Sequence, residues 1–316
     1  MTVPRYEPML AIPWRDPFDH PDWFFEVKWD GVRVIVAIDG PTVTLRSRRG
    51  LDMTGTYPEL TGFRCDRPTV IDGEVVALDD EGRPSFSLLQ QRMNTTGGKA
   101  RTMVERMPVT LMAFDLLHHG APTIDRPLEE RRSRLDEVLP AGMVRSDVTR
   151  GDGRALHEAV VASGLEGIVA KRSGSPYRPG VRSPDWRKVV HRRSGRFVVG
   201  GYLPGEGARS PSFASLLLGL FDGEHLRFVG AAGSGFDHAS LGHIRTALDQ
   251  MQRPSSPFFL DVSIPRAARF VEPALVAVVE YREWTHQRHL RAPVFKGFTA
   301  DPIEVVTWQA EGPDAG

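Results

Sequence analysis

Cysteine is nearly absent from this sequence, since Cys65 is the only one among 316 residues. A single cysteine cannot form an intramolecular disulfide, and it cannot supply the ligands of a multi-cysteine zinc site. A disulfide-stapled scaffold and a cysteine-rich zinc protein are therefore excluded. Sparse cysteine is also typical of proteins in reducing compartments, so we expect a cytoplasmic location.

Long hydrophobic runs are missing as well. A membrane-spanning helix needs about 20 predominantly apolar residues, whereas apolar runs such as 215–221 have only the length of a strand. The first residues also lack the apolar segment and cleavage site of a signal peptide. We expect neither a membrane span nor contact with a membrane.

A net charge is absent too, because 40 basic and 40 acidic residues cancel. Neutrality removes the simplest signature of a nucleic-acid-binding protein, but it does not exclude a local patch. Residues 171–196 form such a patch in the sequence, with nine Lys or Arg residues and a single acid, Asp185. This basic segment is either a solvated face or a surface that binds phosphates.

What the chain does contain is enough apolar sequence for a packed core, at 41% hydrophobic residues. At about 100–200 residues per domain, its length allows two domains. Alternation of apolar residues predicts strands over 32–38, 42–47, 69–78, 108–117 and 167–171. Helices are predicted over 128–139 and 153–163. The predicted fold class is therefore α+β, with antiparallel sheets and more strand than helix.

The character of the sequence changes after about residue 195. Short strands are predicted over 196–203, 213–221, 225–230 and 275–283, with one helix over 238–251. Several short strands and a single helix are typical of a small β-barrel. We place the boundary between Ser194 and Gly195, which gives domains 1–194 and 195–316.

The residues with the most suggestive chemistry precede the first of these strands, in the run Lys28-Trp29-Asp30-Gly31-Val32-Arg33. A lysine becomes a nucleophile when neighbouring cations or a metal favour its neutral amine. Asp30 could hold an ammonium or a metal ion, and Gly31 allows the backbone to approach a ligand closely. Taken alone, the run favours a surface lysine in a β-turn.

Five further motifs follow in order, and each alone also fits a purely structural role. They are Ser47-Arg48-Arg49-Gly50, Asp72-Gly73-Glu74, Phe114-Asp115-Leu116-Leu117, Glu166-Gly167-Ile168-Val169-Ala170-Lys171 and Trp186-Arg187-Lys188. Together with the lysine run, this ordered set resembles the covalent nucleotidyltransferases, and specifically the ATP-dependent DNA ligases. The flanking sequences, among them 7–11, 57–60 and 84–90, also resemble the ligase domains of bacterial end-joining proteins and the small bacterial ligase C group.

The resemblance implies a ligase-type adenylation domain followed by an OB-fold domain. It also implies a role for each matching residue. Lys28 would attack the α-phosphate of ATP, Glu26 would lie against the adenine, Phe114 would stack on it, and Glu74 would bind the ribose hydroxyl. Arg33 and Arg48 would contact the ribose or the nick phosphate, Lys171, Arg182 and Lys188 would hold phosphate oxygens, and Asp30 and Glu166 would bind the divalent metal.

The implied reaction is the sealing of nicked duplex DNA, with ATP as AMP donor and Mg²⁺ or Mn²⁺ as metal. AMP passes from ATP to lysine and then to the 5′-phosphate of the nick, and the 3′-hydroxyl finally displaces it. Each step spreads negative charge over phosphoryl oxygens, which is why cations gather in these motifs. The ligase C resemblance implies a repair role beside a primase-polymerase partner.

Two motifs depart from the family pattern, and both departures remove cations. Val190 stands where the fifth motif usually has its second lysine, with Arg187, His191 or Arg192 as alternatives. The last motif usually reads R-x-D-K, whereas residues 299–302 read Thr-Ala-Asp-Pro. Arg291 and Lys296 are the nearby alternatives there.

Two other functions stay open at this stage. Another enzyme of the superfamily, an RNA ligase or a capping guanylyltransferase, would share the lysine run. A non-catalytic OB-fold protein that binds nucleic acid would tolerate the lost cations, but it would have no need of Lys28, Glu74 and Glu166.

Overall fold

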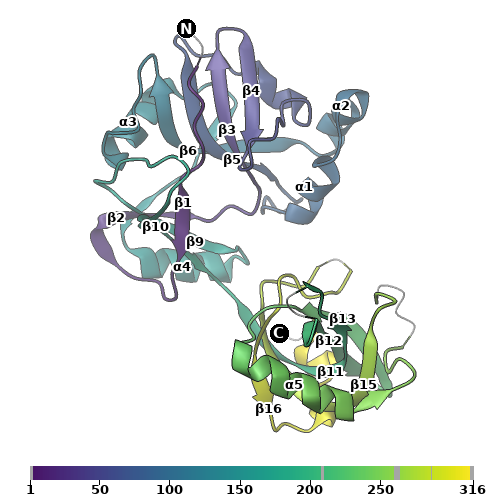
Figure 1. Ribbon diagram of the computed structural model, residues 1–316. Coiled ribbons are helices and arrows are strands. Elements are labelled where there is room, and N and C mark those ends of the chain that lie inside the picture. The colour runs from purple at the N-terminus through teal and green to yellow at the C-terminus, as the bar shows by residue number, and fades with distance from the viewer. Residues whose placement is uncertain (1–2, 208–209, 260–263, 286, 314–316) are drawn as a thin grey trace. The chain divides into compact units, whose positions relative to one another are not determined.

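The computed structural model describes residues 3–207, 210–259, 264–285 and 287–313, in two compact units (Figure 1). The first unit is Met1–His191 and the second is Arg192–Gly316. The expected boundary at Ser194 falls two residues inside strand β11 (Arg193–Pro204). Across the described residues, no helix is both long and apolar enough to cross a bilayer.

The first unit contains two sheets that face each other. One sheet has the order β4-β3-β5-β6-β7, formed by β4 (Thr42–Ser47), β3 (Val32–Asp39), β5 (Thr69–Ala77), β6 (Val109–His119) and β7 (Met143–Arg145). Its pairs are antiparallel except β6 with β7. Val34, Val36 and Ile38 alternate along β3 and point into an apolar core.

Helices cover that apolar face. Leu89 of α1 (Phe86–Arg92), Leu135 of α3 (Leu128–Val138) and Leu60 of a 3-10 helix (Pro58–Gly62) all belong to the same core. A further helix, α2 (Gly97–Arg106), packs beside the 3-10 helix. The opposite face of β3 and β5, which carries Arg33 and Glu74, is left for the second sheet.

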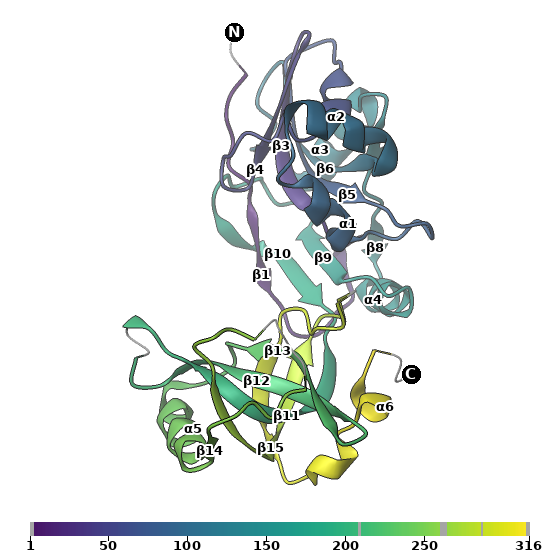
Figure 2. The same cartoon turned by 90° about the vertical axis from the view of Figure 1, so that its right-hand side faces the viewer.

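The second sheet has the order β1-β10-β9-β2-β8. Its strands are β1 (Leu10–Pro13), β10 (Arg182–Val190), β9 (Gly167–Arg172), β2 (His20–Val27) and β8 (Thr149–Gly151). One face packs on α4 (Gly153–Ala162) through Phe25, Ile168 and Val189, and Figure 2 shows α4 beside β9. The other face carries Glu26, Lys171 and Trp186, with Lys171 opposite Trp186 and Glu26 opposite Val169.

A small aromatic cluster joins the two sheets. Phe114 and Ile35 enter it from the first sheet, Trp186 and Met9 from the side of the second, and Tyr177 from the segment before β10. Residues from both sheets therefore meet around Phe114, and the functional motifs lie on these facing surfaces.

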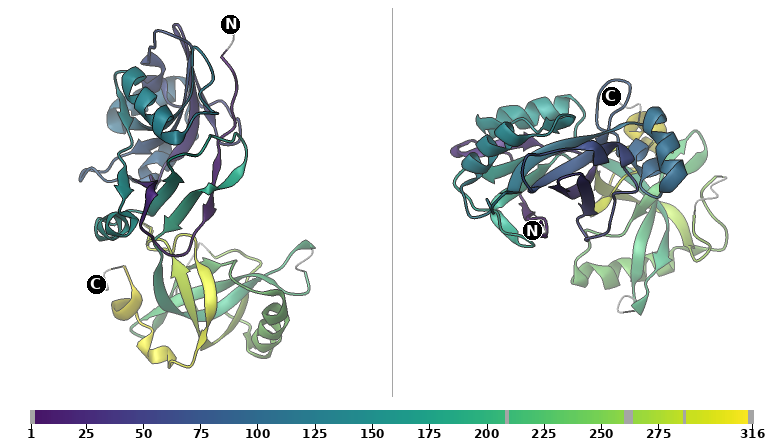
Figure 3. Two further views of the ribbon diagram at one scale, coloured as in Figure 1. Left: turned by 90° about the vertical axis from the view of Figure 1, so that its left-hand side faces the viewer. Right: turned by 90° about the horizontal axis from the view of Figure 1, so that it is seen from above.

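The second unit is a curled sheet with one long helix, which confirms the predicted OB-fold (Figure 3). Its order is β13-β12-β11-β15-β14, with β16 paired to β15. The bounds are β12 (Phe213–Asp222), β13 (His225–Ala232), α5 (His238–Gln250), β14 (Gln252–Arg253), β15 (Arg269–Tyr281), β16 (Val294–Thr299), a 3-10 helix (Ile303–Val305) and α6 (Trp308–Glu311). Leu241, Ile244 and Leu248 of α5 contribute to the core of this unit.

Candidate active site

Lys28 lies in the loop between β2 and β3, and it meets Glu166 there. Its Nζ atom donates a hydrogen bond to Oε2 of Glu166 at 2.5 Å. Its backbone amide donates to the carbonyl of Gly167 at 2.8 Å, which fixes the loop against β9. The Lys28 side chain is 22% exposed, so it can be reached from solvent, whereas that of Glu166 is 6% exposed. The site thus holds an accessible amine against a buried carboxylate.

Gly31 allows this loop to lie against strand β5. A Cβ atom on Gly31 would sit 2.2 Å from the carbonyl oxygen of Val75 and 2.9 Å from Cγ of Glu74. No side chain fits at those distances, so any other residue would displace the loop. We expected Gly31 to allow close approach to a ligand, but the neighbour that requires a glycine here is β5.

Glu26 accepts hydrogen bonds from two buried cations. Its Oε2 atom accepts from Nζ of Lys171 at 2.8 Å, and Oε1 accepts from Nη1 of Arg132 at 2.8 Å. The Lys171 ammonium lies 4.2 Å from the ring centre of Phe114 and 4.4 Å from that of Trp186. Burial lowers the pKa of Lys171, although Glu26 opposes this shift.

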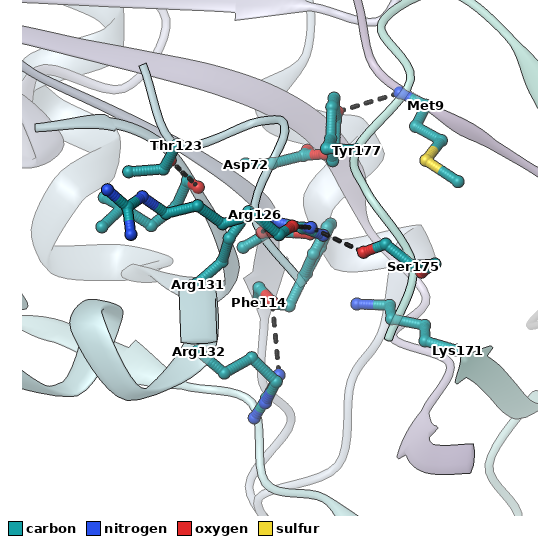
Figure 4. Close-up of polar contacts among 12 residues, drawn as sticks. Met9, Asp72, Phe114, Thr123, Arg126, Arg131, Arg132, Lys171, Ser175 and Tyr177 are labelled. Carbon is teal, nitrogen blue, oxygen red and sulfur yellow. Dashed lines mark hydrogen bonds and ion pairs between the residues drawn. The ribbon is translucent and has the colours of Figure 1, made fainter. Parts of the chain in front are cut away.

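Arg33 is held by Asp72 in a bidentate ion pair. Its Nε and Nη2 atoms lie 2.9 and 2.6 Å from the two carboxylate oxygens. Tyr177 donates its hydroxyl to Asp72 Oδ2 at 2.5 Å, and that hydroxyl accepts from the amide of Met9 at 2.9 Å (Figure 4). Fork-to-fork pairing fixes the guanidinium plane, so Arg33 presents a defined cation beside Phe114 and Trp186.

Glu74 is a partly buried carboxyl group amid other charges. Burial raises its pKa to about 8, the cations Arg33 and Lys28 oppose that rise, and the charges of Asp72 and Glu166 add to it. Burial and the neighbouring carboxylates thus favour the neutral form of Glu74, whereas a cation bound nearby would favour its charged form.

This raised pKa predicts a pH-dependent effect of Glu74→Gln on stability. Between pH 4.5, the ordinary pKa, and about 8, the folded chain must keep a proton that the unfolded chain has released. Wild-type stability should then fall as the pH rises through this window, because the folded state binds more protons. Glutamine has no such proton, so the melting temperature of Glu74→Gln relative to wild type should rise by about 5 °C from pH 5 to pH 8.

Thermal unfolding of protein freed of nucleotide and metal would measure this difference. Glu105→Gln, at an exposed position of α2, is the matched control. A constant difference between Glu74→Gln and wild type across the window would contradict the raised pKa.

The remaining sequence-predicted residues are Lys188, Asp30, Arg48 and Arg182. Lys188 lies on β10 opposite Val169, on the same face as Trp186. Asp30 lies in the Lys28 loop. Arg48 is exposed in the turn after β4, and Arg182 donates to the carbonyl of Ala11 at 2.7 Å at the start of β10. Among the described residues, no hydrogen bond or ion pair joins Arg48 or Arg182 to Lys28 or Glu166.

The arrangement of carboxylates bears on metal binding. Among the described residues, no group of three or more His, Cys, Asp or Glu side chains forms a ready-made metal site. Mg²⁺ is usually held by one or two carboxylates together with substrate phosphates, so a site of this kind needs only Glu166 and Asp30 from the protein. The carboxylate crowding around Glu74 and Glu166 fits a cation bound there.

The alternatives for the missing cations have other partners. The guanidinium of Arg187 lies 3.9 Å from the ring centre of Trp14 and 4.4 Å from that of Trp23, on the α4 side of the sheet. The Arg187 side chain therefore lies on the opposite face of the sheet from Lys188. Arg291 pairs with Glu283 at 2.6 Å, and Lys296 pairs with Glu280 at 3.2 Å. Arg192 lies 3.5 Å from the carbonyl of Ala292 within the second unit.

Sequence reasoning missed three residues that support the site, namely Arg132, Ser146 and Tyr177. Arg132 follows Arg131 on α3 and has the same local context as any arginine of a surface helix. Ser146 and Tyr177 lie in irregular segments outside the motifs. Their partners are distant in sequence, so no local spacing indicates them.

Two family models match most of the chain. Residues 8–189 match the ATP dependent DNA ligase domain, and residues 209–302 match the ATP dependent DNA ligase C terminal region. Among curated proteins, the multifunctional non-homologous end joining DNA repair protein LigD of Mycobacterium tuberculosis is 37% identical over 295 residues. That match covers 90% of this chain and 37% of LigD. A DNA ligase of Thermococcus onnurineus is 30% identical over 275 residues, covering 82% of this chain and 47% of that protein.

Solved structures agree with these matches. A mycobacterial DNA ligase D complexed with ATP and MES is 32% identical, with a TM-score of 0.54, and the match covers 96% of this chain and 98% of that one. A Lig E DNA ligase shares the fold with a TM-score of 0.61 at 16% identity, covering 92% of this chain and 99% of that one. The chain spans little more than a third of the length of the LigD relatives.

Proposed function

Since this chain belongs to the ATP-dependent DNA ligase family, we propose that it seals nicks in duplex DNA through AMP carried on Lys28. The observation that carries the proposal is the 2.5 Å contact between Lys28 Nζ and Glu166 Oε2. The charges of both residues also act on the pKa of Glu74. Lys28 is thereby reachable and fixed in position, and neighbouring cations or a bound metal would favour the neutral amine that a covalent nucleotidyl transfer needs.

In the first step the neutral amine of Lys28 attacks the α-phosphorus of ATP, and pyrophosphate leaves. Glu166 Oε2 is the acceptor already within hydrogen-bonding distance of the amine, so it orients Nζ and can take its proton. Lys171 and Lys188 would hold the α-phosphate oxygens, where charge accumulates in the transition state. Phe114 and Glu26 would bind the adenine, and Glu74 the ribose.

In the second step AMP passes from Lys28 to the 5′-phosphate of the nick, and in the third the 3′-hydroxyl displaces AMP. Arg33, fixed by Asp72, would contact the nick phosphate or the ribose, with Arg48 and Arg182 as further phosphate contacts. A divalent ion, Mg²⁺ or Mn²⁺, bound by Glu166 and Asp30 would neutralise phosphoryl charge in each step.

The direct test is incubation with α-labelled ATP and Mg²⁺ or Mn²⁺, followed by addition of a nicked duplex. We expect covalent label on the protein and then a sealed strand, with no sealing when the nick carries a 5′-hydroxyl. Label from GTP instead would favour a capping enzyme, sealing confined to RNA an RNA ligase, and no label at all a non-catalytic OB-fold protein.

The LigD relatives suggest the biological setting. They are described as multifunctional end-joining proteins, and this chain matches only 37% of their length. We propose a role in DNA repair, with a primase-polymerase as the partner that prepares the ends. The cytoplasmic location expected from the single cysteine stays a prediction, and so do the domain bounds 1–194 and 195–316.

The basic segment should contact the duplex that flanks the nick. Arg192 and Arg193 are exposed at its end. Each phosphate that a cation neutralises contributes about −0.9 to the log–log slope of affinity against salt. Replacing both arginines with alanine should therefore reduce the slope by up to about two units, while Lys28 adenylation stays near wild type.

Nick affinity at several salt concentrations would measure this slope. The matched control replaces Arg101 and Arg106, which are exposed on α2 outside the basic segment. An unchanged slope in the Arg192/Arg193 variant would identify the segment as a solvated face.

A further inference from the structure

Arg132 links the residues around the candidate adenine site from behind. Its Nη1 atom donates to the carbonyl of Phe114 at 3.2 Å (Figure 4) and to Glu26 Oε1 at 2.8 Å, and Nη2 donates to the carbonyl of Ser146 at 2.7 Å. The residue is 4% exposed. One buried guanidinium therefore connects β2, β6 and the segment after β7.

Ser146 extends this connection to the Lys28 loop. It is fully buried, and its Oγ atom accepts from Nε1 of Trp29 at 2.9 Å. Its amide donates to the carbonyl of Ala113 at 2.7 Å. Trp29 directly follows Lys28, so the lysine loop, Phe114 and Glu26 are tied to one another through Arg132 and Ser146.

We propose that Arg132 is a positioning residue for base selectivity, which fixes the Glu26 carboxylate as an acceptor for the exocyclic amine of adenine. This inference rests on the proposed function, because it takes Glu26 as a base contact. A carboxylate has about four lone-pair sites, and Arg132 and Lys171 each occupy one. The remaining sites can only accept hydrogen bonds while Glu26 is ionised.

Selectivity follows because the free sites of the ionised Glu26 carboxylate can accept a hydrogen bond but cannot donate one. Adenine presents an amine donor at its 6-position, whereas hypoxanthine and guanine present an oxygen there. An oxygen facing a fixed carboxylate leaves both acceptors without a donor, and a buried mismatch of this kind discriminates strongly. The discrimination depends on Glu26 being unable to turn away, and Arg132 supplies that restraint on the Oε1 side.

Lys171 is less suited to the same role. Its ammonium has a single described hydrogen bond to Glu26, and it also lies over the rings of Phe114 and Trp186. It is the proposed phosphate contact and would have to serve that partner during the reaction. The three acceptors of Arg132 all belong to the protein, and no substrate group is proposed for it. Arg132 can therefore stay bound to Glu26 throughout the reaction.

The test compares ATP with inosine triphosphate, which carries an oxygen in place of the 6-amine, in the adenylation of Lys28. Arg132→Lys keeps a positive charge but cannot reach three acceptors in a planar fork. We expect it to raise KM for ATP about tenfold, to leave kcat within about threefold, and to lower the preference for ATP about tenfold. Arg132→Gln should lower the preference further.

Arg131→Lys is the matched control. Arg131 precedes Arg132 on the same helix and is fully buried, but it pairs with Asp115 at 2.7 and 2.8 Å. We expect this variant to keep the wild-type preference for ATP. If Arg131→Lys and Arg132→Lys lose the preference for ATP equally, the cause is a general loss of packing, and the inference is overturned.

The wild-type protein provides a test that does not depend on any variant folding. If it takes label from both triphosphates with equal efficiency, the inference fails while the proposed ligase function stands. If it takes label from neither, the proposed function itself fails. An Arg132→Lys protein that folds, adenylates Lys28 and keeps the full ATP preference would also refute the positioning role.

Discussion

Replacing Lys28 with alanine is expected to abolish transfer of AMP to the protein, and Lys28→Arg should do the same. Alanine has no nucleophile, and arginine stays protonated at any pH that the protein tolerates. The fall in adenylation rate should be at least about 10⁴-fold, the scale on which loss of a covalent nucleophile acts. Label retained on the protein after denaturing electrophoresis measures the step directly.

A pre-adenylated nick separates chemistry from folding in this experiment. Lys28 donates nothing to the last step, so Lys28→Ala should still seal a nick whose 5′-phosphate already carries AMP. Lys99→Ala, at an exposed position of α2, is the control and should take label like wild type. Covalent AMP on either Lys28 variant would move the nucleophile elsewhere.

Glu166→Ala should reduce both adenylation and the sealing of a pre-adenylated nick by at least about 100-fold. The substitution removes the acceptor that holds Lys28 Nζ at 2.5 Å, and it removes a proposed metal ligand. Loss of a charge-assisted hydrogen bond or of a metal contact lowers the rate of such transfers by several-fold to orders of magnitude. Single-turnover rates of the two steps would show the effect.

A graded pair of variants distinguishes the two duties of Glu166. Glu166→Gln keeps an acceptor for Lys28 but loses the charge, so raising the Mg²⁺ or Mn²⁺ concentration should restore part of its rate. The alanine variant should not recover at any metal concentration. Glu158→Ala, at an exposed position of α4, is the control. Sealing at the wild-type rate by Glu166→Ala would remove Glu166 from the site.

Strands with one apolar and one polar face could be predicted from the sequence. The β3–β4 hairpin is an example, because Val34, Val36 and Ile38 alternate before Asp39-Gly40, and Gly40 has the positive φ that its tight turn needs. Other confirmed strands, such as β5 and β6, are buried along nearly their whole length.

Two strands that carry the site, β2 and β10, were not predicted from the sequence. In β2, Trp23 and Phe25 face the α4 core while Phe24 and the buried Glu26 face the site, so no polar face marks the alternation. In β10, Arg182, Asp185, Arg187 and Lys188 hide the buried Trp186 and Val189. The charges of the basic segment indicated a surface, and they obscured the buried residues that mark β10 as a strand.

The motif residues of the site were predicted, but their supports were not. Lys28 and Glu166 are 138 residues apart, and only the resemblance to a family associates them. Arg132 is 106 residues from Glu26, and it lies outside the six motifs on which the resemblance rests. Long-range pairs of this kind have no local pattern, and burial of a charge shows only in three dimensions.

The hydrogen bond from the amide of Met9 to Tyr177 connects the segment before β1 to the candidate active site. Tyr177 in turn holds Asp72, which fixes Arg33, and β1 adds itself in parallel to β10. A shortened recombinant fragment that began just before the lysine motif would therefore lose a sheet edge and one end of this relay together. Affinity tags placed close to Met9 would act on the same relay, so a minimal catalytic fragment has to begin upstream of it.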